Sequence, residues 1–139
     1  MKNAARVLAM AMTILPLMAA AQGNHRISAN IPFEFVAGDK VAPAGTYTMN
    51  ITGWDLSQAL LQNRAAKFAI YSMVSPAEPP KTASSSALVF HRYGSQYFLV
   101  GVRMSNSMTS YTVPAGHAEK ELKARNVPET DEILLALAQ

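Results

Sequence analysis

The stretch "LVFHRYGSQYFLV", residues 88–100, joins two apolar runs at Gly94-Ser95. A glycine at the first central position of a two-residue connection is typical of a type II′ hairpin turn. We therefore predict an antiparallel hairpin with strands over 87–93 and 96–104. Because both runs carry apolar residues on both faces, we expect these strands to lie centrally in a sheet, covered on both sides.

The same hairpin contains the strongest candidate for an active site, the cluster His91, Arg92 and Tyr93. Successive side chains of a strand point to opposite faces, so His91 and Arg92 cannot act on one substrate atom without a bulge. A general base or a metal ligand at His91 is the alternative. We predict instead that His91 packs across from an aromatic residue such as Phe98.

Upstream, apolar and polar residues alternate as in half-buried strands. Segment 26–38 predicts one strand with Pro32 at an edge or at the strand start. Its apolar face carries Ile31, Phe33 and Phe35. A turn over 41–45 leads to 46–52, "TYTMNIT", the clearest strand of the chain.

The middle of the chain predicts a second hairpin. The second half of 54–63 is expected to be a strand, although its leucines also suit a short helix. A turn at Asn63-Arg64 would join it to a strand over 65–74, since Asn tolerates the left-handed backbone conformation. The Pro- and Ser-rich segment 75–86 is predicted to be an exposed loop within a single domain.

One short surface helix is predicted over about 117–126. Glu119 and Lys123 are four residues apart, as are Glu121 and Arg125, and both pairs have the favourable order. Asn126 suits the left-handed position that ends a helix. A thin apolar stripe, Ala118 and Leu122, would face the protein. For 131–138 we predict a closing strand, with a helix as the alternative.

The N-terminus has the pattern of a secretory signal peptide over 1–21. Lys2 and Arg6 precede the uncharged run 7–21, which ends in an A-x-A site before Gln22. A membrane anchor is the alternative, but this run of 15 residues is shorter than the roughly 20 that a spanning helix needs. A buried helix would show a polar face, which this run lacks. We predict cleavage after Ala21, a secreted or periplasmic protein, and one antiparallel β domain over 22–139.

Composition excludes several classes of function. The chain has 12 basic and 9 acidic residues, and loss of Lys2 and Arg6 leaves a net charge of +1. Because the remaining cations are scattered, we expect no nucleic-acid partner. The chain has no cysteine, which excludes disulfides, thiol nucleophiles, cysteine zinc sites and a lipobox anchor.

The motifs "PAGTYT" at 43–48 and "FHRYG" at 90–94, with the charged helix, resemble a group of small secreted bacterial proteins of unknown function. The similarity spans most of 22–139, in the same order. It departs before the helix, where Ala115-Gly116 stand in place of a basic residue and a serine. The resemblance implies bacterial export and an all-β core, and it implies no activity.

No catalytic, cofactor or metal site is predicted. The histidines His25, His91 and His117 are scattered, and His117 with Glu121 gives two ligands on one helix face, which do not make a site. Glu34 and Asp55 could be imagined as a glycosidase pair, but Glu34 fits a solvated strand position. Neither G-x-S-x-G nor G-x-x-x-x-G-K occurs. We expect a non-enzymatic protein.

The fold class predicted is all-β, a mainly antiparallel sandwich or small barrel with one surface helix. Its role would be binding or structural, toward a protein or glycan surface outside the cell. Candidate contact residues are Tyr93, Tyr97, Tyr111, Trp54 and Arg103, although we favour their being ordinary core and strand residues. A small barrel that carries an apolar ligand is the alternative, and a hydrolase is less favoured.

Overall fold

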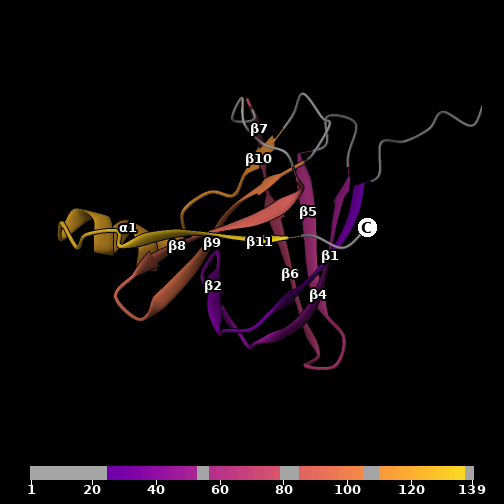
Figure 1. The fold of residues 1–139 in the computed structure, drawn as a ribbon, viewed down its shortest axis with the longest axis horizontal. Coiled ribbons are helices and arrows are strands. Elements are labelled where there is room, and N and C mark those ends of the chain that lie inside the picture. Colours follow the sequence, from indigo (N-terminus) through magenta and orange to yellow (C-terminus); the bar gives the residue numbers. More distant parts are fainter. Residues whose placement is uncertain (1–24, 53–56, 79–84, 105–109, 137–139) are drawn as a thin grey trace, which may run out of the picture.

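The computed structural model describes residues 25–52, 57–78, 85–104 and 110–136. These residues form two antiparallel-rich sheets and one short helix (Figure 1). Sheet A contains β1 (His25–Ile31), β4 (Gly45–Thr52), β5 (Gln58–Asn63) and β6 (Phe68–Met73), in that order. Sheet B contains β2 (Phe35–Ala37), β3 (Lys40–Ala42), β7 (Ser75–Ala77), β8 (Ala87–Tyr93), β9 (Gln96–Arg103), β10 (Ser110–Thr112) and β11 (Asp131–Ala136), and α1 spans His117–Ala124.

The alternating segment 46–52 forms the centre of sheet A, as predicted. Tyr47, Met49 and Ile51 of β4 are buried, while the residues between them face away from the core. The strand has β1 on one side and β5 on the other, both antiparallel. An apolar face of this kind can be buried only against a second layer, which is why sheet A packs against sheet B.

The opening hairpin forms the middle of sheet B, as predicted. Strands β8 and β9 pair from Ala87 and Arg103 to Tyr93 and Gln96, with a bulge at Val89/Phe90. At the turn, φ is 63° at Gly94 and is not positive at Ser95, as a type II′ turn requires. Strand β11 continues the sheet beyond β8, and β10 and β7 continue it beyond β9.

The prediction of one continuous strand over 26–38 is wrong. Strand β1 ends at Ile31, and the chain passes from sheet A to sheet B through residues 32–34. Pro32 has no N–H with which to continue the ladder, so the break falls where proline removes a hydrogen bond. Phe35 then begins β2, which turns through Gly38-Asp39 into β3 and touches β9 in parallel at Phe98.

The core lies between the two sheets and is rich in edge-to-face aromatic contacts. Phe35 packs edge-on against Tyr47 of sheet A and Phe90 of sheet B, with ring centroids 5.1 and 5.4 Å apart. The strands of the two sheets cross steeply in Figure 1, and α1 lies at the end of sheet B that projects away from sheet A. The architecture is an all-β sandwich with one helix near the C-terminus, which confirms the predicted fold class.

The turn between β5 and β6 differs from the prediction. It occupies residues 64–67 and Lys67, not Asn63, has the left-handed backbone, with φ of 53°. Asn63 ends β5 as a buried residue, and its side-chain oxygen accepts a hydrogen bond from the Ala66 N–H at 3.1 Å. The asparagine therefore stabilises the turn through its side chain.

The predicted loop 75–86 is shorter at its start than expected. Residues 75–77 form β7, which pairs with β10 at the edge of sheet B.

The second half of 54–63 is a strand, as predicted, and so is β11; the helix alternative for each is wrong. Trp54, Asp55 and the signal-peptide segment 1–21 lie outside the described residues.

Helix α1 ends as predicted but docks by a different face. Asn126 has φ of 54°, and the N–H of Val127 bonds the Leu122 carbonyl, which together close a Schellman motif. Ala118, expected to face the protein, is exposed, whereas Glu119 is 2 % exposed. Glu119 pairs with Lys123, as the spacing predicts, but its side chain is buried beneath this surface helix.

Candidate binding site beneath helix α1

The face of sheet B that points away from sheet A is partly covered by α1. The side chains of His91 and Tyr93 point to this outer face of sheet B, whereas those of Phe90 and Arg92 point to the opposite face. His91 pairs across the strands with Phe98, as predicted, and Tyr93 packs edge-on against the same ring with centroids 5.6 Å apart. Helix α1 therefore packs against the aromatic end of the β8–β9 hairpin.

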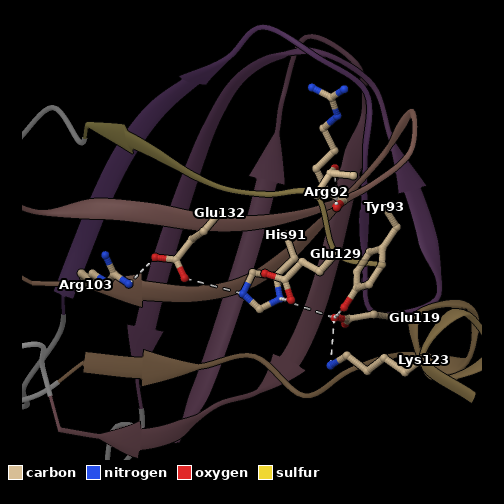
Figure 2. Close-up of polar contacts among 9 residues, drawn as sticks. His91, Arg92, Tyr93, Arg103, Glu119, Lys123, Glu129 and Glu132 are labelled. Carbon is tan, nitrogen blue, oxygen red and sulfur yellow. Dashed lines mark hydrogen bonds and ion pairs between the residues drawn. The ribbon is translucent and has the colours of Figure 1, made fainter. Parts of the chain in front are cut away.

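Glu119 of α1 is the buried charged residue of this interface. The Tyr93 hydroxyl donates a hydrogen bond to Oε1 of Glu119 at 3.3 Å, and Lys123 Nζ lies 3.2 Å from the same oxygen (Figure 2). The pKa of Tyr93 rises from 10.0 to about 12, mainly because the phenol is buried and also because the Glu119 and Glu129 carboxylates disfavour its anion. The phenol therefore stays protonated and keeps its proton available to Glu119.

The His91 ring lies among three carboxylates. Its Nδ1 is 3.4 Å from Glu129 and 3.9 Å from Glu119, and its Nε2 is 3.8 Å from Glu132. Glu132 also pairs with Arg103 of β9. These distances bring together side chains from β8, β9, β11, α1 and the segment before β11 (Figure 2).

Next to this cluster the uncovered part of the sheet face is hollowed into a cleft of about 410 Å³, which we call the α1 cleft. It extends over β8, β9, β10 and β7 and is bounded by α1 and by residues 113–115. Aliphatic parts of its wall come from Val89, Val113 and Pro114, and polar parts from His91, Ser110 and Glu119. The wall also contains Arg103, Thr112 and Lys123, so aliphatic and polar residues contribute about equally. A concave surface on which polar groups converge beside aliphatic ones is typical of a small-molecule site.

Two polar atoms of residues that line the α1 cleft have no hydrogen-bond partner among the described residues. They are Oγ of Ser110 and Nδ1 of His91, and each atom is buried. Ser110 as a whole is 6 % exposed. Nδ1 of His91 lies near Glu129 but without the alignment of a hydrogen bond. Buried polar groups are nearly always hydrogen-bonded, so two such atoms without a partner are a rare feature that needs an explanation.

Arg92 lies apart from His91, as the alternation of the strand predicts (Figure 2). Its Nε donates to the Gly94 carbonyl at 2.7 Å, and its guanidinium lies 5.9 Å from the Tyr97 ring centroid. Its carbonyl accepts hydrogen bonds from both the N–H and the hydroxyl of Thr130. Arg92 thus fixes the hairpin tip and the start of β11.

The aromatic residues considered as a binding surface are mostly interior. Tyr93 and Tyr111 are buried, and burial raises the pKa of Tyr111. Tyr97 is half-buried and stacks on Phe33 with centroids 4.0 Å apart. The interpretation of these tyrosines as core and strand residues is confirmed, while Arg103 is brought to the α1 cleft.

The other residues weighed from the sequence do not converge on one site. His117 and Glu121 pair at 3.6 Å on the exposed face of α1, and Glu34 is exposed between β1 and β2. His25 begins β1, in sheet A. Within the described ranges, no group of three or more His, Asp or Glu side chains is placed to hold a metal ion.

Sequence reasoning missed Glu119, Ser110 and the link from Arg103 to Glu132. Glu119 was assigned to a solvated helix, although it shares a helix face with Leu122 at a spacing of three. Sharing a face with Leu122 made the burial of Glu119 possible, but the pattern of so short a helix did not decide it. The place of Ser110 depends on the pairing of β10 with β9, which the sequence pattern does not specify.

A scan against models of protein families, a search of curated proteins and a search of solved structures each found no match to this chain. Among the residues that the structure describes, no helix has the length and apolar character needed to cross a bilayer.

Proposed function

We propose that this protein is an exported, non-enzymatic binding protein and that its binding site is the α1 cleft. The observation that carries the proposal is the buried Oγ of Ser110, a residue of the cleft wall, which has no hydrogen-bond partner among the described residues; Nδ1 of His91 has none either, although Glu129 lies 3.4 Å from it. Leaving such groups unpaired costs about 1–3 kcal/mol each, and a ligand that pairs them recovers this free energy.

Binding at the α1 cleft is favoured over an apolar ligand inside the sandwich. The interior is occupied by rings in direct contact, among them Phe35, Tyr47 and Phe90. A carrier that holds an apolar ligand between its sheets needs a cavity at that place. The α1 cleft, in contrast, opens to solvent on the outer face of sheet B.

A non-enzymatic role is supported by how the charged groups are used. Glu119 is held by Tyr93 and Lys123, and Glu132 by Arg103. A general base or nucleophile must be free to reach a substrate atom. Carboxylates engaged in this way stabilise the interface between α1, β8 and β11 and shape the cleft.

The test is a thermal-shift screen of the purified protein against sugars, organic acids, amines and fatty acids. A compound present at about 100 times its Kd stabilises the folded state by roughly 2.7 kcal/mol, a shift of several degrees. We expect Ser110→Ala to reduce the shift, and Ala115→Trp, which places a large ring at the cleft wall, to abolish it. Ser95→Ala, at the hairpin tip, is the matched control. A ligand that shifts all four proteins equally, or a screen without any shift, would refute the proposal.

Export is the second part of the proposal, and it has its own prediction. The order of basic head, apolar run and A-x-A site predicts that the exported protein starts at Gln22. The resemblance to small secreted bacterial proteins supports the same expectation. Intact-mass measurement of protein expressed in a Gram-negative host would check it, and a product that keeps Met1 and stays with the membranes would contradict it.

A further inference from the structure

Both cations in the wall of the α1 cleft are engaged in ion pairs within the protein. Lys123 lies 3.2 Å from Glu119, and Arg103 contacts Glu132. The His91 ring lies 3.4 Å from Glu129 and 3.8 Å from Glu132. The remaining charged residue of the wall, Glu78, is exposed at the rim, where water solvates it.

A ligand with a net charge would have to compete with one of these pairs. Glu119 is 2 % exposed, and withdrawing Lys123 from it would leave a buried carboxylate with less compensation. Although Lys123 itself is about half exposed, removing a cation from a buried carboxylate costs more than breaking a fully exposed pair. The arrangement therefore favours a ligand without net charge.

The unpartnered atoms indicate what an uncharged ligand must supply. The hydroxyl of Ser110 can donate one hydrogen bond and accept others, and His91 Nδ1 donates or accepts according to the tautomer. Hydroxyl groups are the simplest uncharged partners that serve in either direction. Ser110 and His91 lie on β10 and β8, with β9 between them, so a ligand that pairs both atoms must carry hydroxyl groups at well-separated positions.

The walls of the cleft suit the carbon face of such a molecule. Val89, Val113 and Pro114 provide aliphatic contacts, and Gly101 opposite Val89 leaves the floor without a side chain. A Cβ at Gly101 would lie 2.9 Å from the Tyr111 carbonyl oxygen, so the strand permits no larger residue there. Glycine within a strand often marks a close approach of a ligand or of another backbone.

The cleft does not suit an added peptide strand. Its outer border is β7, an edge strand, and the central residue of β7 is Pro76. Proline has no N–H for a new ladder, and proline on an edge is a common guard against strand addition. A volume of about 410 Å³ is near the lower end of the range for ligand pockets, so a molecule of monosaccharide to disaccharide size fits.

We propose that the α1 cleft binds a small uncharged polyhydroxylated molecule, a sugar or a polyol. The inference rests on the proposed function, since it names the ligand class of the same cleft. Ser110 and His91 pair its hydroxyl groups, the valines and Pro114 contact its C–H face, and the internal ion pairs disfavour charged analogues.

The experiment is isothermal titration calorimetry of the exported protein, which is expected to start at Gln22, with matched probes. Glucose, galactose, mannose and sorbitol are the uncharged probes; glucuronate and glucosamine are the charged counterparts at constant ionic strength. We expect at least one uncharged probe to bind and both charged probes to bind roughly tenfold more weakly or worse. Ser110→Ala should weaken the best probe by about tenfold, and Ser95→Ala should not change it.

Each other outcome overturns the inference and separates it from the proposed function. If glucuronate or glucosamine binds more tightly than the uncharged probes, and Ser110→Ala removes that binding, the cleft is a binding site for charged ligands and only the ligand class is wrong. If no probe binds while another compound from the thermal-shift screen depends on Ser110, the same conclusion holds. If a sugar binds equally well to Ser110→Ala and Ala115→Trp, it binds outside the cleft, and the inference fails.

Discussion

Glu119 shows how one buried carboxylate links helix and sheet. It accepts a hydrogen bond from Tyr93, pairs with Lys123 and lies 3.9 Å from His91. A buried carboxylate is tolerated only where donors and cations surround it. The three partners come from β8 and from α1 itself, so Glu119 fixes where the helix sits on the hairpin.

Replacing Glu119 should destabilise the fold more than replacing its helical neighbour. Glu119→Ala leaves the Tyr93 hydroxyl and Lys123 without their partner, and we expect the free energy of unfolding to fall by about 1–3 kcal/mol. Glu121→Ala removes an exposed contact to His117 and should cost less than about 0.5 kcal/mol. Urea unfolding of both variants measures the difference, and equal midpoints would contradict the role given to Glu119.

Tyr93 should make stability depend on alkaline pH. Its pKa of about 12 in the folded state lies above its ordinary value of 10.0. Between these values the folded state keeps a proton that the unfolded chain has lost, so the free energy of unfolding decreases as pH rises from 10 to 12. The decrease due to Tyr93 is at most about 2–3 kcal/mol.

Tyr93→Phe provides the measurement, because phenylalanine keeps the ring contact with Phe98 but cannot ionise. Tyr47 and Tyr111, whose pKa values are also raised by burial, titrate in both proteins and cancel in the comparison. Urea midpoints at pH 9 to 12 should fall more steeply in the wild type than in the variant. Parallel curves would show that the Tyr93 proton is not linked to folding.

At the level of single residues, the sequence predicted the direction of side chains better than their burial. The opposite directions of His91 and Arg92 follow from strand periodicity alone, and the structure confirms them. The burial of Glu119 depends on which helix face meets the sheet, and the stripe of Ala118 and Leu122 indicated a neighbouring face. An eight-residue helix has too few positions for its apolar pattern to decide between adjacent faces.

At the level of elements, helix α1 depends on a hairpin far from it in the sequence. The His117 N–H donates to the Asp39 carboxylate at 2.6 Å, so the turn between β2 and β3 caps the helix. Gly116, which precedes the helix, approaches Gly38 so closely that a Cβ would lie 2.1 Å from its carbonyl oxygen. This close approach gives a physical reason for glycine at position 116.

Removing the cap should therefore weaken the docking of α1. We expect Asp39→Ala to lower the free energy of unfolding by about 0.5–2 kcal/mol, and Asp39→Asn, which keeps an accepting oxygen, to lower it less. Hydrogen exchange of the α1 amides gives a local measurement, and exchange should be faster in Asp39→Ala. Unchanged α1 exchange in that variant would contradict a capping role.

Elements with strong local signals were predicted well. Strand β4 follows from strict alternation, hairpin β8–β9 from the glycine turn, and the end of α1 from Asn126. Errors occurred where local patterns continued across a change of sheet. The apolar spacing of Ile31, Phe33 and Phe35 persists through Pro32, because both sheets bury their side chains in the same core.

At the scale of the whole molecule, one core holds the two sheets together. Phe90 is fully buried and contacts Phe33 and Phe35 edge-on, with centroids 5.2 and 5.4 Å apart. Core residues come from β1, β4 and β5 on one side and from β2, β8 and β9 on the other. Sandwich and barrel could not be separated from the sequence, since alternation is the same in both.

Truncation of the central ring tests this arrangement. Phe90→Ala should lower the free energy of unfolding by about 3–5 kcal/mol, because it removes buried surface and leaves a cavity between the sheets. Tyr71→Ala, on the exposed side of β6, is the matched control and should cost less than about 0.5 kcal/mol. If both variants unfold at the same urea concentration, Phe90 is not a central contact of the core.

The contact between Asp39 and His117 spans 78 residues of chain, and this has a consequence for the order of folding. A helix of eight residues is too short to persist alone in water, so α1 depends on its contacts with the β2–β3 turn and with β8. Contacts between segments so distant in sequence form late in folding, because the chain loses the entropy of closing a long loop before the contact contributes any stability. We therefore expect the C-terminal part of the chain, which contains α1 and β11, to be among the last parts to fold. The α1 cleft would be complete only in chains that have reached this stage.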